Sequence, residues 1–106
     1  MDFKVQGDNL GLDEDEFLEL VELFTETSSA ELNKLKSAIE QQDAQAVVEA
    51  AHSIKGSSGN IGFQNIYETA REVEANARKN IFKGASEAVK SIKTSIDRIE
   101  ETLKKA

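Results

Sequence analysis

Apolar residues recur along most of the chain at the three- and four-residue spacing of amphipathic helices, and no segment of useful length alternates with period two. The first strong stripe follows Asp13, which forms the pattern of a capping box with Glu16, while Leu12 and Phe17 have the spacing of a hydrophobic staple. One long helix is predicted, with apolar positions at Phe17, Leu20, Val21, Phe24, Leu32, Leu35, Ala38 and Ile39. Ser28 falls on the same stripe, so a bend or break near it stays open.

Two further helices follow a turn at residues 41–43. Asp43 is suited to be the N-cap of the second helix. The third opens near Phe63 and ends at Arg78 and Lys79, whose positive charges suit a helix C-terminus. The apolar sides of the two helices consist of Val47, Ala50, Ala51, Ile54 and Ile61, and of Phe63, Ile66, Ala70, Val73 and Ala77.

A loop over residues 80–84 precedes the last helix, whose apolar side consists of Val89, Ile92, Ile96, Ile99 and Leu103. Because short connections favour antiparallel neighbours, the sequence predicts an all-α fold, an antiparallel up-down four-helix bundle over residues 13–106. Residues 1–12 contain Gly7 and Gly11 and are expected to form a short irregular N-terminal tail.

Composition narrows the class of protein. The 106 residues suffice for one domain, and the absence of cysteine excludes disulfides and thiolate metal sites. The net charge of −7 and the dispersed lysines and arginines disfavour nucleic-acid binding. No apolar run approaches the ~20 residues that cross a bilayer, and the N-terminus has no signal-peptide pattern. We therefore expect a cytoplasmic monomer that binds neither nucleic acid nor membranes.

The single histidine, His52, lies on the outer face of the second helix. On a helical wheel it points roughly 150° away from the centre of the apolar side, toward solvent. Gly56 and Gly59 lie on the same side, where each is unfavourable by about 1 kcal/mol relative to alanine and leaves the surface bare. Gln45 and Val48 flank the histidine from the preceding turns. A bare, partly apolar patch around one histidine predicts a docking surface.

The residue types in this patch suit a phosphoryl acceptor. A histidine is largely neutral at cytoplasmic pH, which leaves one ring nitrogen with a free lone pair. Lys55, one turn from His52, is placed to stabilise a phosphoryl group there, and Glu74 to hold the proton of the other ring nitrogen. Lys55 and Glu74 also fit ordinary solvated side chains, and Gly59 also fits a helix end near Asn60.

At these residues the sequence matches a known family. The run Ala51-His52-Ser53-Ile54-Lys55-Gly56-Ser57-Ser58, followed by Ile61-Gly62-Phe63, closely resembles the signature of histidine phosphotransfer (HPt) domains, which the phosphoacceptor domain of bacterial chemotaxis kinases shares. The resemblance continues through Ile66, Ala70, Val73 and Glu74. The short, glycine-interrupted N-terminal segment departs from the many relatives that carry an additional helix.

The resemblance implies a four-helix bundle that accepts a phosphoryl group on His52 from a receiver aspartate or a histidine kinase. The bundle then passes the group to the aspartate of another receiver domain. The family's lysine matches Lys55, its access-giving glycine matches Gly56, and the residue that contacts the imidazole matches Glu74. The receiver brings the aspartate and a Mg²⁺ ion, so the bundle itself is expected to need no metal or other cofactor.

Three other classes of protein share some of these features. Glu49 and His52 have the Glu-x-x-His spacing of di-iron bundles, but those sites need a second such pair and inward-pointing carboxylates. A helical adaptor that docks receiver domains without transferring phosphate stays open. An autonomous kinase is disfavoured, because the chain has no glycine-rich nucleotide loop and no room for an ATP-binding domain. The expected role is that of a phosphoryl carrier rather than an enzyme.

Overall fold

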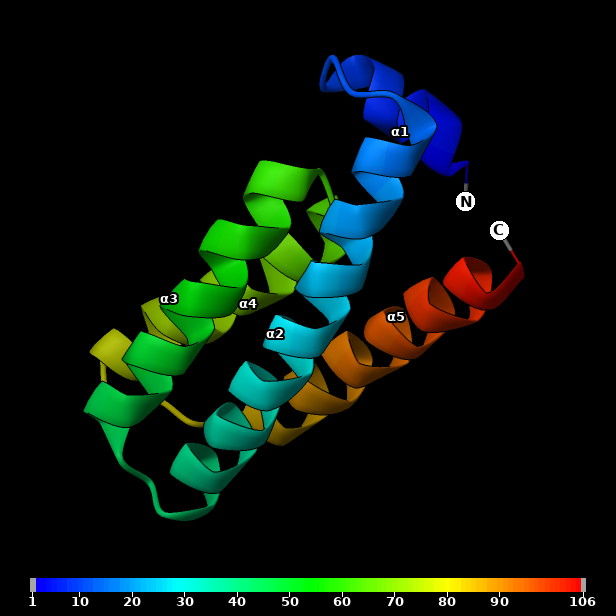
Figure 1. Ribbon diagram of the computed structural model, residues 1–106. Coiled ribbons are helices and arrows are strands. Elements are labelled where there is room, and N and C mark those ends of the chain that lie inside the picture. The colour runs from blue at the N-terminus through cyan, green and yellow to red at the C-terminus, as the bar shows by residue number, and fades with distance from the viewer. Residues whose placement is uncertain (1, 106) are drawn as a thin grey trace.

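The computed structural model describes residues 2–105 as a bundle of helices. The helices are α1 (Phe3–Asn9), α2 (Glu14–Glu40), α3 (Ala44–Ile61), α4 (Gln64–Arg78) and α5 (Ala85–Lys105). Helices α2 to α5 run alternately up and down, and α1 packs against the start of α2 (Figure 1). In the described chain each of these four helices adjoins two others in cyclic order, and the diagonal pairs make no close backbone approach. This is the predicted antiparallel four-helix bundle.

The core consists of the apolar stripes that the sequence predicts. Every predicted position is buried except Leu20 and Leu103. Leu103, in the last turn of α5, is half-buried. Leu20 keeps 43% of its surface exposed, because it lies at the edge of the α2 stripe, where no neighbouring helix covers it. The prediction that it belongs to the core was wrong. Within residues 2–105, none of the helices is long and apolar enough to span a membrane.

Helix α2 runs without a break past Ser28, where the sequence also allows a bend. Ser28 is buried, with 1% of its surface exposed, and its hydroxyl has no hydrogen-bond partner among the described residues. The neighbouring hydroxyls of Thr25 and Thr27 donate to backbone carbonyl oxygens one turn earlier in the same helix. The polar residues in the middle of α2 are therefore accommodated inside a continuous helix.

The N-terminal segment is not the irregular tail that we expected. Residues 3–9 form α1, and the carboxylate of Asp2 caps it by accepting hydrogen bonds from the backbone N–H groups of Lys4 and Val5. The predicted capping box of α2 is present, with Asp13 and Glu16 each accepting the other's backbone N–H.

Packing on α2 explains why so short a helix forms. Phe3 is buried edge-to-face against Phe17, with 5.9 Å between the ring centroids. Gly7 lies inside this helix and faces Phe17. A Cβ at Gly7 would lie 2.9 Å from the Cβ of that phenylalanine, so the absence of a side chain allows the two helices to pack closely. A seven-residue helix is unstable alone, so the contact between α1 and α2 supplies its stability.

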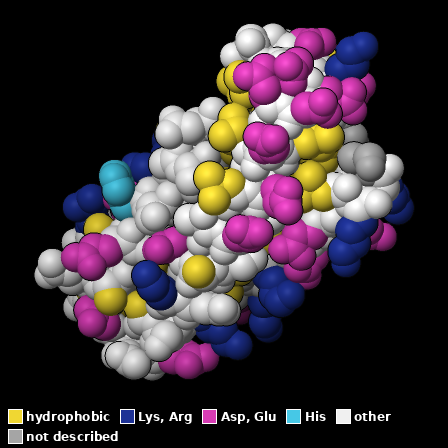
Figure 2. Space-filling model, in the orientation of Figure 1, with side chains coloured by type: hydrophobic (Ala, Val, Ile, Leu, Met, Phe, Trp, Pro, Cys, Tyr) yellow, Lys and Arg dark blue, Asp and Glu magenta, His cyan; other side chains and the backbone are white. Residues whose placement is uncertain are grey.

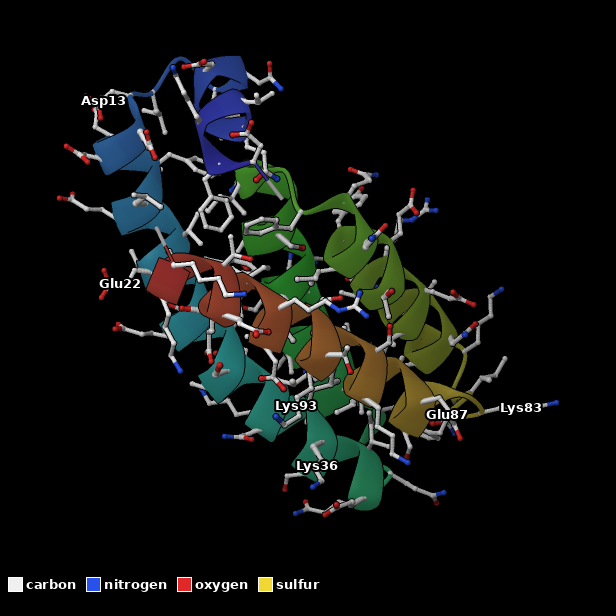
Figure 3. All side chains as sticks on the ribbon, turned by 90° about the vertical axis from the view of Figure 1, so that its right-hand side faces the viewer. Asp13, Glu22, Lys36, Lys83, Glu87 and Lys93 are labelled. Carbon is white, nitrogen blue, oxygen red and sulfur yellow. The ribbon has the colours of Figure 1, made fainter. Side chains whose placement is uncertain are left out.

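The turn between α3 and α4 determines which residues of the two helices meet. Gly62 has a left-handed φ of 90°, and the backbone N–H groups of Gly62 and Phe63 both donate to the carbonyl oxygen of Ser58. Helix α3 therefore ends at Ile61, one residue after Asn60, and the glycine that caps it is Gly62. Gly59 lies in the last turn of the helix. The connections before α3 and after α4 lie at the opposite end of the bundle, which Lys83 and Glu87 mark in Figure 3.

The short turn brings His52 and Glu74 to the same level of the bundle. His52 lies nine residues before the end of α3, and Glu74 lies ten residues after the start of α4. At a rise of about 1.5 Å per residue, both lie roughly 14 Å from the turn.

We expect Gly7→Ala to release α1 from α2, although alanine is favoured over glycine by about 1 kcal/mol inside a helix. The added Cβ would collide with Phe17. Amide hydrogen exchange over residues 3–9 measures the release, and we expect protection there to be lost. Asp8→Ala changes an exposed position of the same helix and should keep the protection. Protection in Gly7→Ala equal to that of the wild type would contradict the close packing.

Candidate functional site

His52 and Glu74 form a hydrogen bond across the surface seam between α3 and α4. The Nδ1 atom of His52 lies 2.9 Å from Oε2 of Glu74. The His52 side chain is 63% exposed, whereas that of Glu74 is 5% exposed. Figure 2 shows the imidazole in cyan, standing out from the surface over α3 with basic side chains beside it. The predicted contact of Glu74 with His52 is thus present, and the interpretation of Glu74 as a solvated residue was wrong.

The hydrogen bond determines which nitrogen of the neutral imidazole carries the proton. An ionised carboxylate can only accept hydrogen bonds, so Nδ1 of His52 must be the donor to Glu74. The lone pair of the neutral ring then lies on Nε2, on the side of the ring turned away from Glu74. An exposed ring with this tautomer is a nucleophile that a partner protein can reach.

Two cations accompany the carboxylate of Glu74. The Nζ atom of Lys55 lies 2.7 Å from Oε1, and Nη2 of Arg78 lies 2.8 Å from Oε2. Burial alone would raise the pKa of Glu74. The hydrogen bonds from Lys55, Arg78 and His52, together with the charge of Lys55, outweigh burial and lower this pKa from 4.5 to about 2. Glu74 is therefore ionised at neutral pH.

Lys55 occupies a different place from the one predicted for a residue that stabilises a phosphoryl group. Its ammonium group contacts Glu74, and its side chain is 25% exposed, so it is not an ordinary solvated lysine. It nevertheless lies one helical turn from His52, within the same network. For its predicted role, the ammonium has to reach the phosphoryl group from its present position on Glu74.

Gln45 and Val48 lie on the side of His52 that faces the start of α3. The amide of Gln45 donates to Glu49, and Val48 is partly buried. Together with residues of α4 they line a shallow hollow beside Arg78 (the hollow is formed by Ala44, Gln45, Val48, Glu49, Ala77 and Arg78). These two residues therefore share one surface with the network around Glu74.

The two glycines of the predicted bare patch differ in their surroundings. A Cβ on Gly56 would meet no described atom within 4 Å, so the surface beside His52 is open there. A Cβ on Gly59 would lie 3.0 Å from the ring of Tyr67 on α4. Gly59 is exposed, but its missing side chain also allows Tyr67 to lie close to α3.

Arg78 was missed as a site residue. Its sequence signal was the spacing of four residues between Glu74 and Arg78, which places the two side chains on one face of a helix. The predicted interpretation of Arg78 as a cation at a helix end hid this pairing. Arg78 binds the carboxylate oxygen that also accepts from His52, so it belongs to the site.

The Glu-x-x-His spacing of Glu49 and His52 does not form part of a metal centre within residues 2–105. Both residues are exposed, and the described chain brings together no group of three or more histidine, aspartate or glutamate side chains that could hold a metal ion.

Comparisons with known proteins identify the family. The family model of the Hpt domain matches residues 19–102, and the chain therefore belongs to the Hpt domain family. The structure is similar to that of histidine-containing phosphotransfer protein B (HptB) from Pseudomonas aeruginosa PAO1, with a TM-score of 0.84 and 28% sequence identity. That match covers 99% of this chain and 91% of the HptB chain. No curated protein sequence matches the chain.

A second solved structure shares the fold. It is the Hpt domain of the Hpt sensor hybrid histidine kinase from Shewanella, with a TM-score of 0.78 and 13% identity over 99% of this chain and 91% of that one. Hpt domains are phosphocarrier modules that interact with histidine kinases and response-regulator receivers. This chain accordingly has a histidine phosphotransfer role in two-component signalling.

We expect Glu74→Gln to lower stability in a pH-dependent way. The pKa of Glu74 is lowered by folding from 4.5 to about 2, so its carboxylate stabilises the fold fully above pH 4.5 and loses this effect as the pH falls through 2. Urea unfolding at neutral pH should show a loss on the order of 2 kcal/mol relative to the wild type. The loss should shrink as the pH falls from 4.5 to 2. Glu72→Gln, at an exposed position of α4, is the control and should differ little from the wild type. A loss that stays constant with pH would show that the charge of Glu74 is not its cause.

The different surroundings of the two glycines predict opposite responses to alanine. Gly56→Ala should raise stability by up to about 1 kcal/mol, because its Cβ enters open space inside a helix. Gly59→Ala should gain less or lose stability, because its Cβ must displace Tyr67. Thermal unfolding of the two variants compares them directly, and an equal gain in both would contradict the contact with Tyr67.

Proposed function

We propose that this protein is a phosphorelay intermediate that accepts a phosphoryl group on Nε2 of His52. The donor is a receiver aspartate or a histidine kinase, and the acceptor is a receiver aspartate. The observation that supports this proposal most directly is the exposed imidazole, whose Nδ1 is held by a buried carboxylate. That arrangement leaves the other nitrogen unprotonated and accessible.

Transfer from an aspartyl phosphate needs no proton movement at His52. The lone pair of Nε2 forms the N–P bond while the P–O bond to the aspartate breaks, and the aspartate carboxylate leaves with the electron pair. Nδ1 keeps its proton, so the phosphorylated ring carries a positive charge. The carboxylate of Glu74, 2.9 Å from Nδ1, stabilises this charge as it develops. The return transfer reverses the same steps.

The partner supplies the rest of the active site. The receiver brings its aspartate and a Mg²⁺ ion, which neutralises the phosphoryl oxygens on its side. On this side, Lys55 stabilises the transferred group, and the open surface at Gly56 admits the receiver's backbone. Gln45, Val48 and Gly59 complete the docking surface. The protein acts as a monomer in the cytoplasm and has no kinase activity of its own.

Phosphotransfer to the purified protein from a panel of labelled phospho-receivers and histidine kinases tests the proposal. We expect the wild type to gain label that is lost in acid and stable in base, as a phosphoramidate bond requires. His52→Gln should gain none while keeping its helical circular dichroism. Label on His52→Gln would place the phosphoryl group elsewhere.

The panel also separates a carrier from an adaptor. An adaptor binds receivers without being labelled, and its binding survives His52→Gln. If no donor labels the wild type while a known relay domain is labelled beside it, the carrier function is rejected.

Gly56→Gln tests the open surface next to His52. A glutamine side chain there occupies the space through which the receiver approaches, and the fold has no described atom for it to displace within 4 Å of the Cβ. We expect transfer from a phospho-receiver to slow by about tenfold or more, with no loss of stability. Transfer at the wild-type rate would show that receivers do not approach over Gly56.

A further inference from the structure

The carboxylate of Glu74 has more cationic partners than its single charge needs. Lys55 binds Oε1 at 2.7 Å and Arg78 binds Oε2 at 2.8 Å, while His52 donates to Oε2 as well. One cation would balance the buried charge. The second cation therefore needs a further explanation.

The two cations differ in how they reach Glu74. Arg78 lies four residues after Glu74 on α4, so its contact depends on that helix alone. Lys55 reaches Glu74 from α3, from the side nearer the turn between the two helices. Lys55 has a flexible stem and a compact ammonium group, whereas the guanidinium of Arg78 is planar and presents several donors in a fixed geometry. Lys55 is the cation better able to change partners.

Arg78 and His52 bind the same oxygen of Glu74. A carboxylate oxygen has two lone pairs, so Oε2 can accept from both donors at once. The guanidinium therefore holds Oε2 in the position where it accepts from Nδ1. Glu49 is the other carboxylate within one helical turn of His52. Its Oε1 accepts a hydrogen bond from the side-chain amide of Gln45.

Phosphorylation would change the charge near Lys55. A phosphoryl group brings about two negative charges and three strong acceptor oxygens to a position one turn from Lys55. If Lys55 were the sole cation at Glu74, its departure would leave a buried carboxylate unpaired apart from His52, which is strongly unfavourable. With Arg78 in place, the carboxylate keeps a cation throughout.

We propose that Arg78 is a positioning residue that keeps Glu74 ionised and directed at Nδ1 of His52 while Lys55 exchanges Glu74 for the phosphoryl group. Arg78 makes and breaks no covalent bond and moves no proton in this exchange. The inference rests on the proposed phosphoryl transfer to His52. It assigns to Arg78 a role in that reaction although the arginine binds neither the imidazole nor the phosphoryl group.

Nitrogen-15 NMR of the unphosphorylated protein gives the first test, because it reports which imidazole nitrogen carries the proton. We expect the Nδ1–H tautomer in the wild type and a mixture of tautomers in Arg78→Gln. Arg78→Lys keeps the charge and should restore most of the wild-type spectrum. Arg71→Gln removes an exposed arginine of α4 that forms no ion pair within the described chain, and it should match the wild type.

Phosphorylation by phosphoramidate, a small-molecule donor that releases ammonia, gives the second test without a docking partner. We expect Arg78→Gln to react about tenfold more slowly than the wild type and than Arg71→Gln. Lys55→Gln should slow the reaction more in the Arg78→Gln background than in the wild type, since Lys55 is then the sole cation left at Glu74. If the rate reduction in the double variant equals the product of the reductions in the two single variants, the proposed exchange of partners by Lys55 is wrong.

The outcomes separate this inference from the proposed function. A wild type that phospho-receivers label, with Arg78→Gln identical to it in tautomer and rate, rejects the role of Arg78 and leaves the relay intact. An altered tautomer in Arg78→Gln, with no label on the wild type from any receiver or kinase, supports the positioning of His52 and rejects the relay.

Discussion

The buried carboxylate of Glu74 is the interaction on which the site depends. An unpaired charge at 4% exposure would be strongly unfavourable, and three donors from two helices remove that cost. The same contacts that make the charge tolerable hold the imidazole in one tautomer. The carboxylate of Glu74 therefore affects both the stability of the fold and the reactivity of the imidazole. The fold places a negative charge next to Nδ1 of the imidazole, where it would stabilise the positive ring that the proposed phosphorylation produces.

The rest of the bundle presents this group at the surface. The core stripes of α2 and α5 contain none of the residues in the Glu74 network, which lies entirely on α3 and α4. Bare backbone at Gly56 and a shallow hollow by Val48 lie on either side of His52, so the ring is reachable along the helix in both directions. Gly59 serves packing as well, because Tyr67 lies against it.

The periodicity of the sequence predicted the structural features that depend on a single helix. The bundle helices, their caps, nearly all of the core and the outward position of His52 follow from spacing along the sequence. The features that the sequence did not predict depend mostly on contacts between helices. Gly7 has the sequence pattern of a helix breaker, but in the structure it packs against Phe17. Leu20 fits the apolar stripe of α2, but it lies at an edge that no other helix covers. The spacing between Glu74 and Arg78 allows a contact within one helix, but the spacing does not determine whether the arginine points to solvent or to the carboxylate. In the structure it binds the carboxylate.

The two-residue connection at Gly62 and Phe63 has a consequence for how such a chain can vary in length. Adding one residue to the start of α4 would rotate Glu74 by about 100° and move it by about 1.5 Å, away from His52. The connections at the other end, residues 41–43 and 79–84, do not determine this alignment. Insertions and deletions in those two connections would therefore preserve the contact between His52 and Glu74, whereas one between α3 and α4 would break it.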